Sequence, residues 1–226
     1  MLGHSKFSKK GGMLVTDYKK EEYWSRFAST FDEDQTHIVG EAIQQTIIGR
    51  LSEESDLGEA VELGCGRGFF TKAIARNAIQ VLATDLSDEM LAMARTQLGD
   101  LQNVTVEKAD CENTAFPSGR FDTVVMVNVV HFIENPAKCL QESYRILKSG
   151  GVLLLADYTG YGMSWFRMMR MGMRFFKKWG KPPRYAKKGL SPDELGSLVE
   201  NAGFKVEEVQ LIGDKTKAIY LKGRKK

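Results

Sequence analysis

The sequence predicts an α/β fold: a doubly wound, mostly parallel seven-stranded sheet in which only the last strand runs antiparallel. Between residues 59 and 157, short β-branched runs alternate with helical periodicity, which is the pattern of βαβ units. Nearer the C-terminus, two more strand-like runs are separated only by a turn at Gly213 and Asp214, so they should pair antiparallel. The expected strands are 59–64, 79–84, 103–108, 121–128, 151–157, 204–212 and 216–222.

Helices are expected before, between and after these strands. The run from Val124 to Val127 is apolar without alternation, as in a central strand that helices cover on both faces. Ser191, Pro192 and Glu194 form the pattern of a capping box at a helix start, and Gly203 would end that helix. The other expected helices are an N-terminal extension at 18–30 and 36–51, then 69–77, 87–98 and 135–148. Candidate buried positions in the extension are Phe27, Ile38, Ile43, Ile47, Ile48 and Leu51.

Length and composition limit the class of protein. The 226 residues suit one main domain with an addition, and 42% hydrophobic with 27% charged residues excludes collagen-like and wholly disordered chains. No apolar run approaches the roughly 20 residues that cross a bilayer, and the lysine-rich N-terminus has no apolar leader segment. Three widely spaced cysteines without a CxxC pair argue against a disulfide scaffold and a structural zinc site. We therefore expect a cytoplasmic protein without a bound metal.

The strongest chemical signal is ELGCGRG at residues 62–68, where a strand gives way to a helix. Glycines there let the backbone turn tightly and approach a ligand, and the helix start offers free N–H groups. The spacing is GxGxG, whereas a dinucleotide site requires GxGxxG, and Phe69 stands at the position of its third glycine. This disfavours an NAD- or FAD-dependent oxidoreductase.

Carboxylates end the next two strands. Asp85 lies 19 residues after Gly66, where an acidic side chain can accept hydrogen bonds from both hydroxyls of a ribose. The same topology places Asp110 to accept from an exocyclic amine of a base. Either carboxylate, taken alone, could instead be a helix cap or a solvated charge in a loop. Together with the glycine loop, they indicate a nucleoside site.

Several ordered motifs resemble those of the class I S-adenosylmethionine-dependent methyltransferases, and more narrowly the UbiE-like group of small-molecule methyltransferases. VELGCGRGFF resembles the first motif of that family, VLATDLS the second, ADCENTAFPSGRFDTVV the third and LKSGGVLLLAD the motif of the fifth strand. The resemblance covers roughly residues 21–157 closely and the C-terminal strands loosely. It implies a Rossmann-like fold and S-adenosylmethionine as cofactor, with S-adenosylhomocysteine as product.

The resemblance also implies a role for each matching residue. Asp85 would bind the ribose hydroxyls, Leu86 would pack against the adenine, and Asp110 with the Cys111 backbone would read the adenine edge. The glycine loop would line the ribose and methionine portions, which Asn128 would also face. The implied cofactor-binding residues are Glu62, which would orient the loop, with Gly64, Cys65, Gly66, Gly68, Asp85, Leu86, Asp110, Cys111 and Asn128.

Two positions depart from the family pattern. Phe31-Asp32 stands where members often have Tyr-Asp over the cofactor, so a hydroxyl is missing. Arg67 replaces the common small or hydroxyl residue of the glycine loop.

Methyl transfer from a sulfonium needs mainly positioning and desolvation, with a base only where the acceptor must lose a proton. His131 is the candidate base, and its alternative is a histidine that only packs or starts a helix. Asp157 and Tyr158, at the end of the fifth strand, are second candidates because ligands bind there in doubly wound sheets. Tyr18 and Tyr23 either close the site or only pack.

The net charge of +3 conceals a strong segregation. Residues 21–157 hold 11 basic and 22 acidic residues, whereas residues 158–190 hold nine basic residues and no acidic one. At 100° per residue, the segment 163–181 is a basic amphipathic helix that ends at Gly180 and Pro182. One stripe holds Arg167, Arg170, Arg174, Lys177, Lys178 and Lys181. The opposite side holds Trp165, Met168, Met169, Met173, Phe175, Phe176 and Trp179, and Met171 lies off that apolar arc.

Three interpretations of this segment differ in what the apolar side covers. The plainest is a lid whose apolar side covers the pocket and whose basic side is solvated. The second is an interfacial helix on an anionic membrane, through which an amphiphilic substrate would enter. Nucleic-acid binding is disfavoured because the aromatic residues lie opposite the charges instead of among them.

The sequence therefore predicts a methyltransferase for a small apolar or amphiphilic acceptor, such as a quinone precursor, a lipid headgroup or a thiol. The alternative is a non-catalytic cofactor-binding or membrane-docking module. Arsenite methylation is disfavoured because Cys65 and Cys111 fall within the cofactor site. The expected organisation is a flexible basic N-terminus at 1–20 and one methyltransferase domain at 21–226, with a lid insertion at 158–190.

Overall fold

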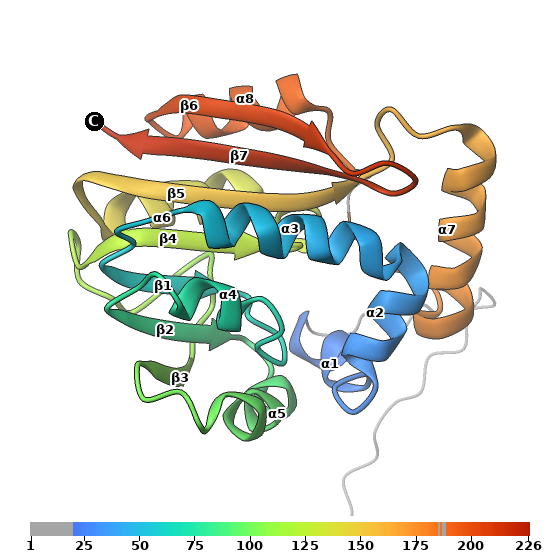
Figure 1. Ribbon diagram of the computed structural model, residues 1–226, viewed down its shortest axis with the longest axis horizontal. Coiled ribbons are helices and arrows are strands. Elements are labelled where there is room, and N and C mark those ends of the chain that lie inside the picture. The colour runs from blue at the N-terminus through green and yellow to red at the C-terminus, as the bar shows by residue number, and fades with distance from the viewer. Residues whose placement is uncertain (1–19, 185, 187–188) are drawn as a thin grey trace, which may run out of the picture.

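A computed structural model describes residues 20–184, 186 and 189–226 of the chain (Figure 1). Almost all of the expected N-terminal segment, residues 1–19, lies outside the described residues, as does Tyr18. No helix among the described residues is long and apolar enough to cross a membrane.

The sheet has seven strands in the order β3-β2-β1-β4-β5-β7-β6. All neighbours pair in parallel except β7, which is antiparallel to both β5 and β6. The fold class, the central position of β4 and the antiparallel last strand are therefore confirmed. The strands are β1 Glu59–Leu63, β2 Gln80–Asp85, β3 Val104–Lys108, β4 Phe121–Val127, β5 Leu147–Thr159, β6 Phe204–Ile212 and β7 Lys217–Lys225.

Polar side chains cap the N-termini of three helices, close to the residues where the sequence predicts these helices to begin. Ser87 and Asn135 cap their helices by accepting from backbone N–H groups, and Ser191 forms the predicted capping box with Glu194. The helices are α1 Lys20–Ser25, α2 Phe31–Val39, α3 Glu41–Glu53, α4 Thr71–Ala75, α5 Asp88–Leu98, α6 Pro136–Ile146, α7 Trp165–Trp179 and α8 Pro192–Asn201, with a short 3-10 helix η1 at Val130–Phe132.

The expected boundaries of the N-terminal helices are wrong. The single helix at 36–51 is two helices, because Gly40 has a φ of +92° and turns the chain between α2 and α3. The helix expected at 18–30 ends at Ser25, and a turn leads to the start of α2 at Phe31. This break places Phe31 at the first turn of α2, at the mouth of the cavity described below.

The sheet is covered on both faces. Alternate residues of β5 belong to different cores: Leu154 and Ala156 pack with α3 and α4, whereas Leu153 and Leu155 pack with α6 and α8. In Figure 1, α3 lies in front of the sheet and α8 behind it. The carboxyl ends of β1, β2 and β4 point towards α1 and α2, and α7 packs against α2 at this end of the molecule.

Candidate functional site

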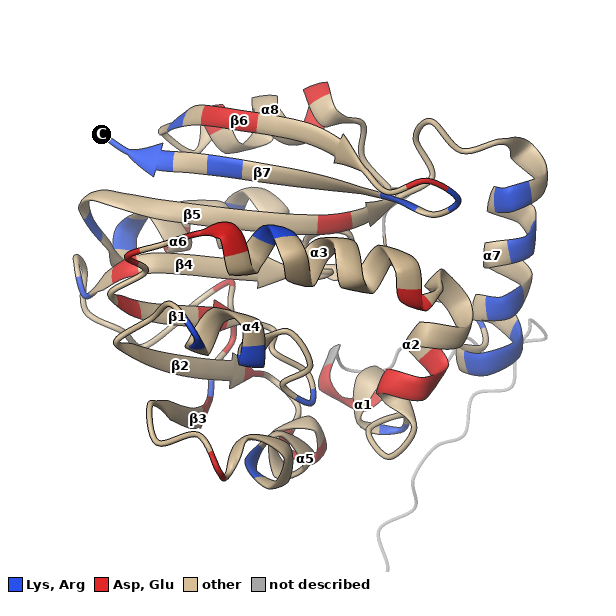
Figure 2. Ribbon diagram, in the orientation of Figure 1, with Lys and Arg blue, Asp and Glu red and all other residues tan. Residues whose placement is uncertain are grey.

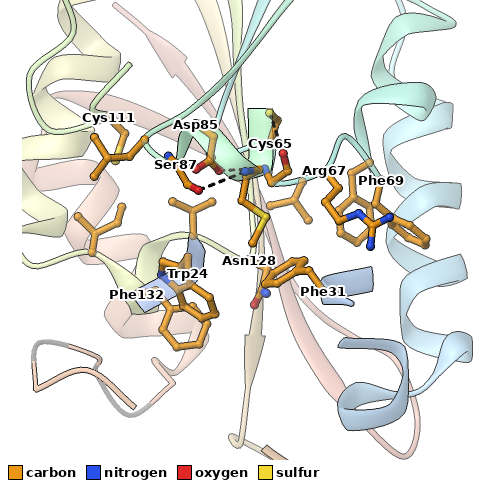
Figure 3. A pocket seen from close by; sticks show the side chains of 18 of the residues that line it. Trp24, Phe31, Cys65, Arg67, Phe69, Asp85, Ser87, Cys111, Asn128 and Phe132 are labelled. Atoms are coloured by element: carbon orange, nitrogen blue, oxygen red, sulfur yellow. Dashed lines mark hydrogen bonds between the residues drawn. The ribbon is translucent and has the colours of Figure 1, made fainter. Parts of the chain in front are cut away.

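A cavity lies at the carboxyl ends of β1, β2 and β4, where doubly wound sheets bind ligands (Figure 3). Its walls come from the loops after β1, β2 and β3, the end of β4, η1 and the N-terminal helices α1 and α2. Its empty space, including the open mouth, is about 1030 Å³. That volume is at the upper end for a small-molecule site.

The glycine loop forms one wall of this cavity. Gly64, Gly66 and Gly68 all have positive φ, at +80°, +55° and +87°. A Cβ on Gly64 would come within 2.6 Å of Val129, and one on Gly68 within 2.6 Å of Leu98. A Cβ on Gly66 would meet only the Phe31 ring, at 3.7 Å, because this part of the loop faces the cavity. Two of the glycines thus serve close packing and the third leaves the backbone open to a ligand.

Asp85 holds the loop and also lines the cavity. Its Oδ2 accepts from the Gly66 N–H at 2.9 Å, and its Oδ1 accepts from the Ser87 N–H at 2.9 Å (Figure 3). Burial raises the pKa of the Asp85 carboxyl, against the effect of these backbone hydrogen bonds. Each carboxylate oxygen has a second lone pair, so Asp85 can accept two more hydrogen bonds from a ligand.

The third strand brings a second carboxylate to the same cavity. Asp110, Cys111 and Leu86 all line it, as the sequence predicted for the adenine end. Asp110 Oδ1 accepts from the Glu112 N–H at 2.9 Å, which fixes the turn after β3.

Asn128 ends β4 in a strained conformation. Its φ is +59°, which is uncommon outside glycine, and its side chain lines the cavity. Its Oδ1 is buried and has no hydrogen-bond partner in the described part of the chain. A strained backbone and a buried acceptor without a partner are typical of a residue that binds a ligand, and less typical of one that only packs.

Aromatic side chains form the wall opposite the glycine loop. Trp24, Phe31 and Phe132 line the cavity, with the Trp24 and Phe132 ring centroids 4.6 Å apart. Trp179, at the end of α7, stacks on Phe31 at 5.1 Å with an interplanar angle of 8°. The rings come from the neighbouring helices α1 and α2 and from η1 and α7, which lie about 100 and 140 residues further along the chain.

Solved structures with this architecture are numerous. A SAM-dependent methyltransferase from Aquifex aeolicus superimposes with a TM-score of 0.66 and 19% identity, over 89% of this chain and 98% of that one. The [4+2]-cyclase SpnF gives a TM-score of 0.71 and 15% identity, over 96% of this chain and 99% of that one. At such identities the likeness establishes the fold alone, and these two proteins carry different chemistries.

Sequence comparison finds a methyltransferase domain and methyltransferase relatives. A model described as a methyltransferase domain matches residues 61–155. A ubiquinone biosynthesis O-methyltransferase of Nitrosomonas europaea is 25% identical over 164 residues, which are 70% of this chain and 66% of that protein. A demethylmenaquinone methyltransferase of Tropheryma whipplei is 31% identical over 101 residues, 45% of this chain and 42% of that protein. The chain thus spans just under two thirds of the first relative and less than half of the second.

These matches agree with the resemblance to class I, UbiE-like S-adenosylmethionine-dependent methyltransferases. The cavity fits the cofactor of that family, S-adenosylmethionine. The open backbone at Gly66, the lone pairs of Asp85 and the unmatched oxygen of Asn128 offer partners for a nucleoside joined to an amino acid. Eight of the implied cofactor residues line the cavity, namely Gly64, Cys65, Gly66, Asp85, Leu86, Asp110, Cys111 and Asn128.

Two of the implied cofactor residues lie behind the glycine loop. Gly68 packs on Leu98, and Glu62 is buried beneath the loop, where it accepts from the Thr71 hydroxyl of α4. This contact joins β1 to the helix that follows the loop, which agrees with the orienting role expected for Glu62. Burial raises the Glu62 pKa to about 7.

The structure pairs His131 with Asp157. Nδ1 of His131 lies 2.9 Å from Asp157 Oδ1, and the His131 N–H donates to Asp157 Oδ2 at 3.1 Å. Asp157 is only 4% exposed, and each of its two carboxylate oxygens contacts this histidine. The pair adjoins the cavity through Phe132, whose ring centroid is 3.9 Å from that of His131.

Of the tyrosines that the sequence singled out, the two that the structure describes, Tyr23 and Tyr158, do not line the cavity. Tyr158 is buried, its hydroxyl has no partner in the described part of the chain, and burial raises its pKa far above the usual range. Because Tyr158 alternates with Asp157 along β5, it points to the opposite face of the sheet. Tyr23 is buried and donates to the Trp179 carbonyl at 3.3 Å, which ties α1 to the end of α7.

The amphipathic helix α7 packs on the rest of the protein with only part of its apolar surface. Met171, Phe175 and Trp179 face the core, so Met171 belongs to the packed side despite its predicted position off the arc. The basic side is partly engaged: Lys178 pairs with Asp34 at 2.6 Å, and Arg174 donates to the His37 carbonyl at 3.2 Å. Figure 2 shows basic positions along α7 and acidic positions on the neighbouring helix α2. Met168 is half-buried, and five other apolar side chains of α7 are exposed: Trp165 (62%), Phe166 (71%), Met169 (40%), Met173 (57%) and Phe176 (65%).

Sequence reasoning missed the aromatic wall. Trp24 and Phe132 received no role, although the spacing of Trp24, Phe27 and Phe31 places three aromatic residues at helical intervals. The rings of Trp24 and Phe31 contact Trp179, which lies more than 140 residues further along the chain. No local sequence pattern reveals such a contact.

Proposed function

We propose that this protein transfers the methyl group of S-adenosylmethionine to a hydroxyl of a small aromatic acceptor, a quinone precursor. The observation that carries the proposal is one cavity with two different walls. The wall with Asp85 and the glycine loop suits the nucleoside of the methyl donor, and the wall with Trp24, Phe31 and Phe132 suits a flat apolar ring.

The chain's own residues would do most of the work by positioning. S-adenosylmethionine, when bound, supplies a methyl group already activated on a sulfonium. Asp85 would hold the ribose by accepting from its hydroxyls, and the glycine loop would let the donor lie directly on the backbone. The aromatic wall would exclude water and hold the acceptor ring for in-line attack.

The His131–Asp157 pair supports an acceptor that must lose a proton. With its Nδ1 held 2.9 Å from the Asp157 carboxylate, the imidazole keeps Nε2 as the acceptor nitrogen. Nε2 would take the proton of a phenolic hydroxyl as the oxygen attacks the methyl group, and the Asp157 carboxylate would stabilise the imidazolium that results. Such a base agrees with the O-methyltransferase activity named for the Nitrosomonas relative.

A second part of the proposal concerns α7 and an anionic membrane surface. Five large apolar side chains of α7 are exposed on one side, and Arg170 and Lys177 follow Phe166 and Met173 by four residues, at the edge of that side. Aromatic rings that enter the lipid interface and cations that meet anionic headgroups would bind together. Since Phe175 and Trp179 at the end of α7 reach the aromatic wall, this contact would bring an amphiphilic acceptor close to the site.

A direct test measures S-adenosylhomocysteine release with a panel of quinone precursors that carry one free ring hydroxyl, beside matched precursors with that hydroxyl already methylated. We expect release only with the free hydroxyl. A folded protein that binds no S-adenosylmethionine would refute the function, and equal release with both sets would refute hydroxyl transfer.

A further inference from the structure

Two of the three cysteines form a thiol pair between the cavity and the protein core. Cys111 follows β3, is half-buried and lines the cavity (Figure 3). Cys139 lies near the start of α6 and is fully buried. A hydrogen bond with the Cys111 thiol, together with burial, raises the pKa of the Cys139 thiol well above its usual range. The two sulfur atoms are therefore neighbours, although the residues are distant in sequence.

Contacts on either side of the thiol pair hold the loop after β3 against α6. Oε1 of Glu112 accepts from the N–H of Asn135, the capping residue of that helix, at 3.4 Å. Further along the loop, the Thr114 N–H and hydroxyl donate to Oε1 of Glu142, at 2.8 and 2.6 Å. The loop therefore lies along the same turns of α6 that carry the buried thiol, which agrees with the contact between the two sulfur atoms.

The two thiols of the pair differ in access. Cys139 is closed off from solvent, and its thiol donates to the Met126 sulfur at 3.5 Å, whereas Cys111 is open to the cavity. An oxidant therefore reaches the pair at Cys111. The third cysteine, Cys65, is buried in the glycine loop, where its thiol donates to the Gly66 carbonyl at 3.5 Å. Burial raises the pKa of the Cys65 thiol well above its usual range, which keeps it unreactive.

We infer that Cys111 and Cys139 form a reversible disulfide that lowers the affinity of the cavity for S-adenosylmethionine. A hydroperoxide would oxidise the Cys111 thiol to a sulfenic acid and would itself be reduced to an alcohol, or to water in the case of hydrogen peroxide. The Cys139 thiol would then attack the Cys111 sulfur, so that the S–S bond forms and water leaves. Together the two thiols lose two electrons and two protons, which the hydroperoxide takes up, and a thiol reductant reverses the reaction.

The disulfide would disturb the adenine end of the cavity. It holds its two sulfur atoms about 2 Å apart, so its formation draws Cys111 from the cavity wall towards α6. The preceding residue, Asp110, fixes the turn after β3 by accepting from the Glu112 N–H at 2.9 Å. Asp110 and the Cys111 backbone are the groups expected at the adenine edge. The effect on the cofactor therefore rests on the proposed function, whereas formation of the disulfide does not.

The first measurement is peptide mass spectrometry of the full chain after treatment with hydrogen peroxide. We expect a link between Cys111 and Cys139 that dithiothreitol reverses, with Cys65 still a thiol. Cys111→Ser should form no link within the chain, whereas the control variant Cys65→Ser should form the same link as the unaltered protein. Oxidation of Cys111 to sulfinic or sulfonic acid without a link, or a link that includes Cys65, would overturn the inference.

The second measurement relates the disulfide to the cofactor. Calorimetric titration should give a Kd for S-adenosylmethionine about 5- to 150-fold higher for the oxidised than for the reduced protein, the usual range for coupling between two sites. Because such coupling is reciprocal, saturating S-adenosylmethionine should raise the reduction potential of the pair, measured in glutathione buffers, by about 30 mV for each tenfold difference in Kd. A disulfide that leaves both the Kd and the potential unchanged would overturn its effect on the cavity. Reduced protein that binds no S-adenosylmethionine would instead overturn the proposed function.

Discussion

Replacing Asp85 with alanine removes a carboxylate that has two functions in the cofactor site. It accepts from the Gly66 and Ser87 N–H groups, each at 2.9 Å, and so fixes the loop after β1 against the end of β2. Its remaining lone pairs face the cavity, where the nucleoside of S-adenosylmethionine is expected. The variant should therefore lose cofactor affinity even where the fold is retained.

The size of the loss follows from these contacts. Hydrogen bonds to a charged group contribute more than neutral ones, but the carboxylate is also desolvated by burial, as the raised pKa of Asp85 shows. Losing the contacts to two ribose hydroxyls should cost about 1 to 3 kcal/mol of binding free energy, or about 5- to 140-fold in Kd.

Calorimetric titration with S-adenosylmethionine measures this loss, and a thermal melt of each free protein separates binding from stability. Asp122→Ala is the matched control, because Asp122 also accepts from a backbone N–H, that of Glu59, but pairs with Lys148 outside the cavity. We expect the control to keep the original Kd. An Asp85→Ala protein that is folded and binds within twofold of the original would refute the assignment of this carboxylate.

Three further changes test other parts of the account. The pKa of Glu62 is about 7 in the fold against 4.5 in the unfolded chain, so ionisation of Glu62 lowers the free energy of unfolding as the pH rises from 4.5 to 7, by up to about 3 kcal/mol. Glu62→Gln should therefore raise the melting temperature at pH 8 and leave it nearly unchanged at pH 4. A rise at pH 4 without one at pH 8 would contradict the effect of burial on this carboxyl. His131→Ala should lower kcat about 10²- to 10⁴-fold with the Kd for S-adenosylmethionine unchanged, and Asp157→Asn should act in the same direction; full activity in either would exclude the pair as the base. Arg170→Glu with Lys177→Glu should abolish flotation with anionic vesicles and spare cofactor affinity, whereas binding that persists would exclude the electrostatic contact.

The sequence allowed the sheet and the cofactor side of the site to be predicted because both depend on local order. In a parallel sheet, residues that follow successive strands meet at one edge, so Gly66, Asp85, Asp110 and Asn128 came together as expected. The break at Gly40 was missed because the apolar spacing continues across it, and only the φ of +92° shows that the chain turns there.

The acceptor side could not be predicted because it depends on packing between distant segments. Periodicity identified the apolar arc of α7, but nothing in the pattern says that Phe175 and Trp179 pack inward while Phe166 and Phe176 remain exposed. The partner of His131 was likewise unspecified, since Asp157 is 26 residues away and on another strand.

Transfer of a labelled methyl group tests the central claim most directly. The protein is incubated with S-adenosylmethionine that carries a deuterated methyl group and a quinone precursor with one free hydroxyl, and mass spectrometry follows both products. The account predicts one labelled methyl on the acceptor oxygen for each S-adenosylhomocysteine formed, and less of both products with Asp85→Ala when S-adenosylmethionine is kept below the Kd of that variant. Cofactor binding without transfer to any acceptor in the panel, or label on the acceptor that is unaffected by Asp85→Ala, would contradict it.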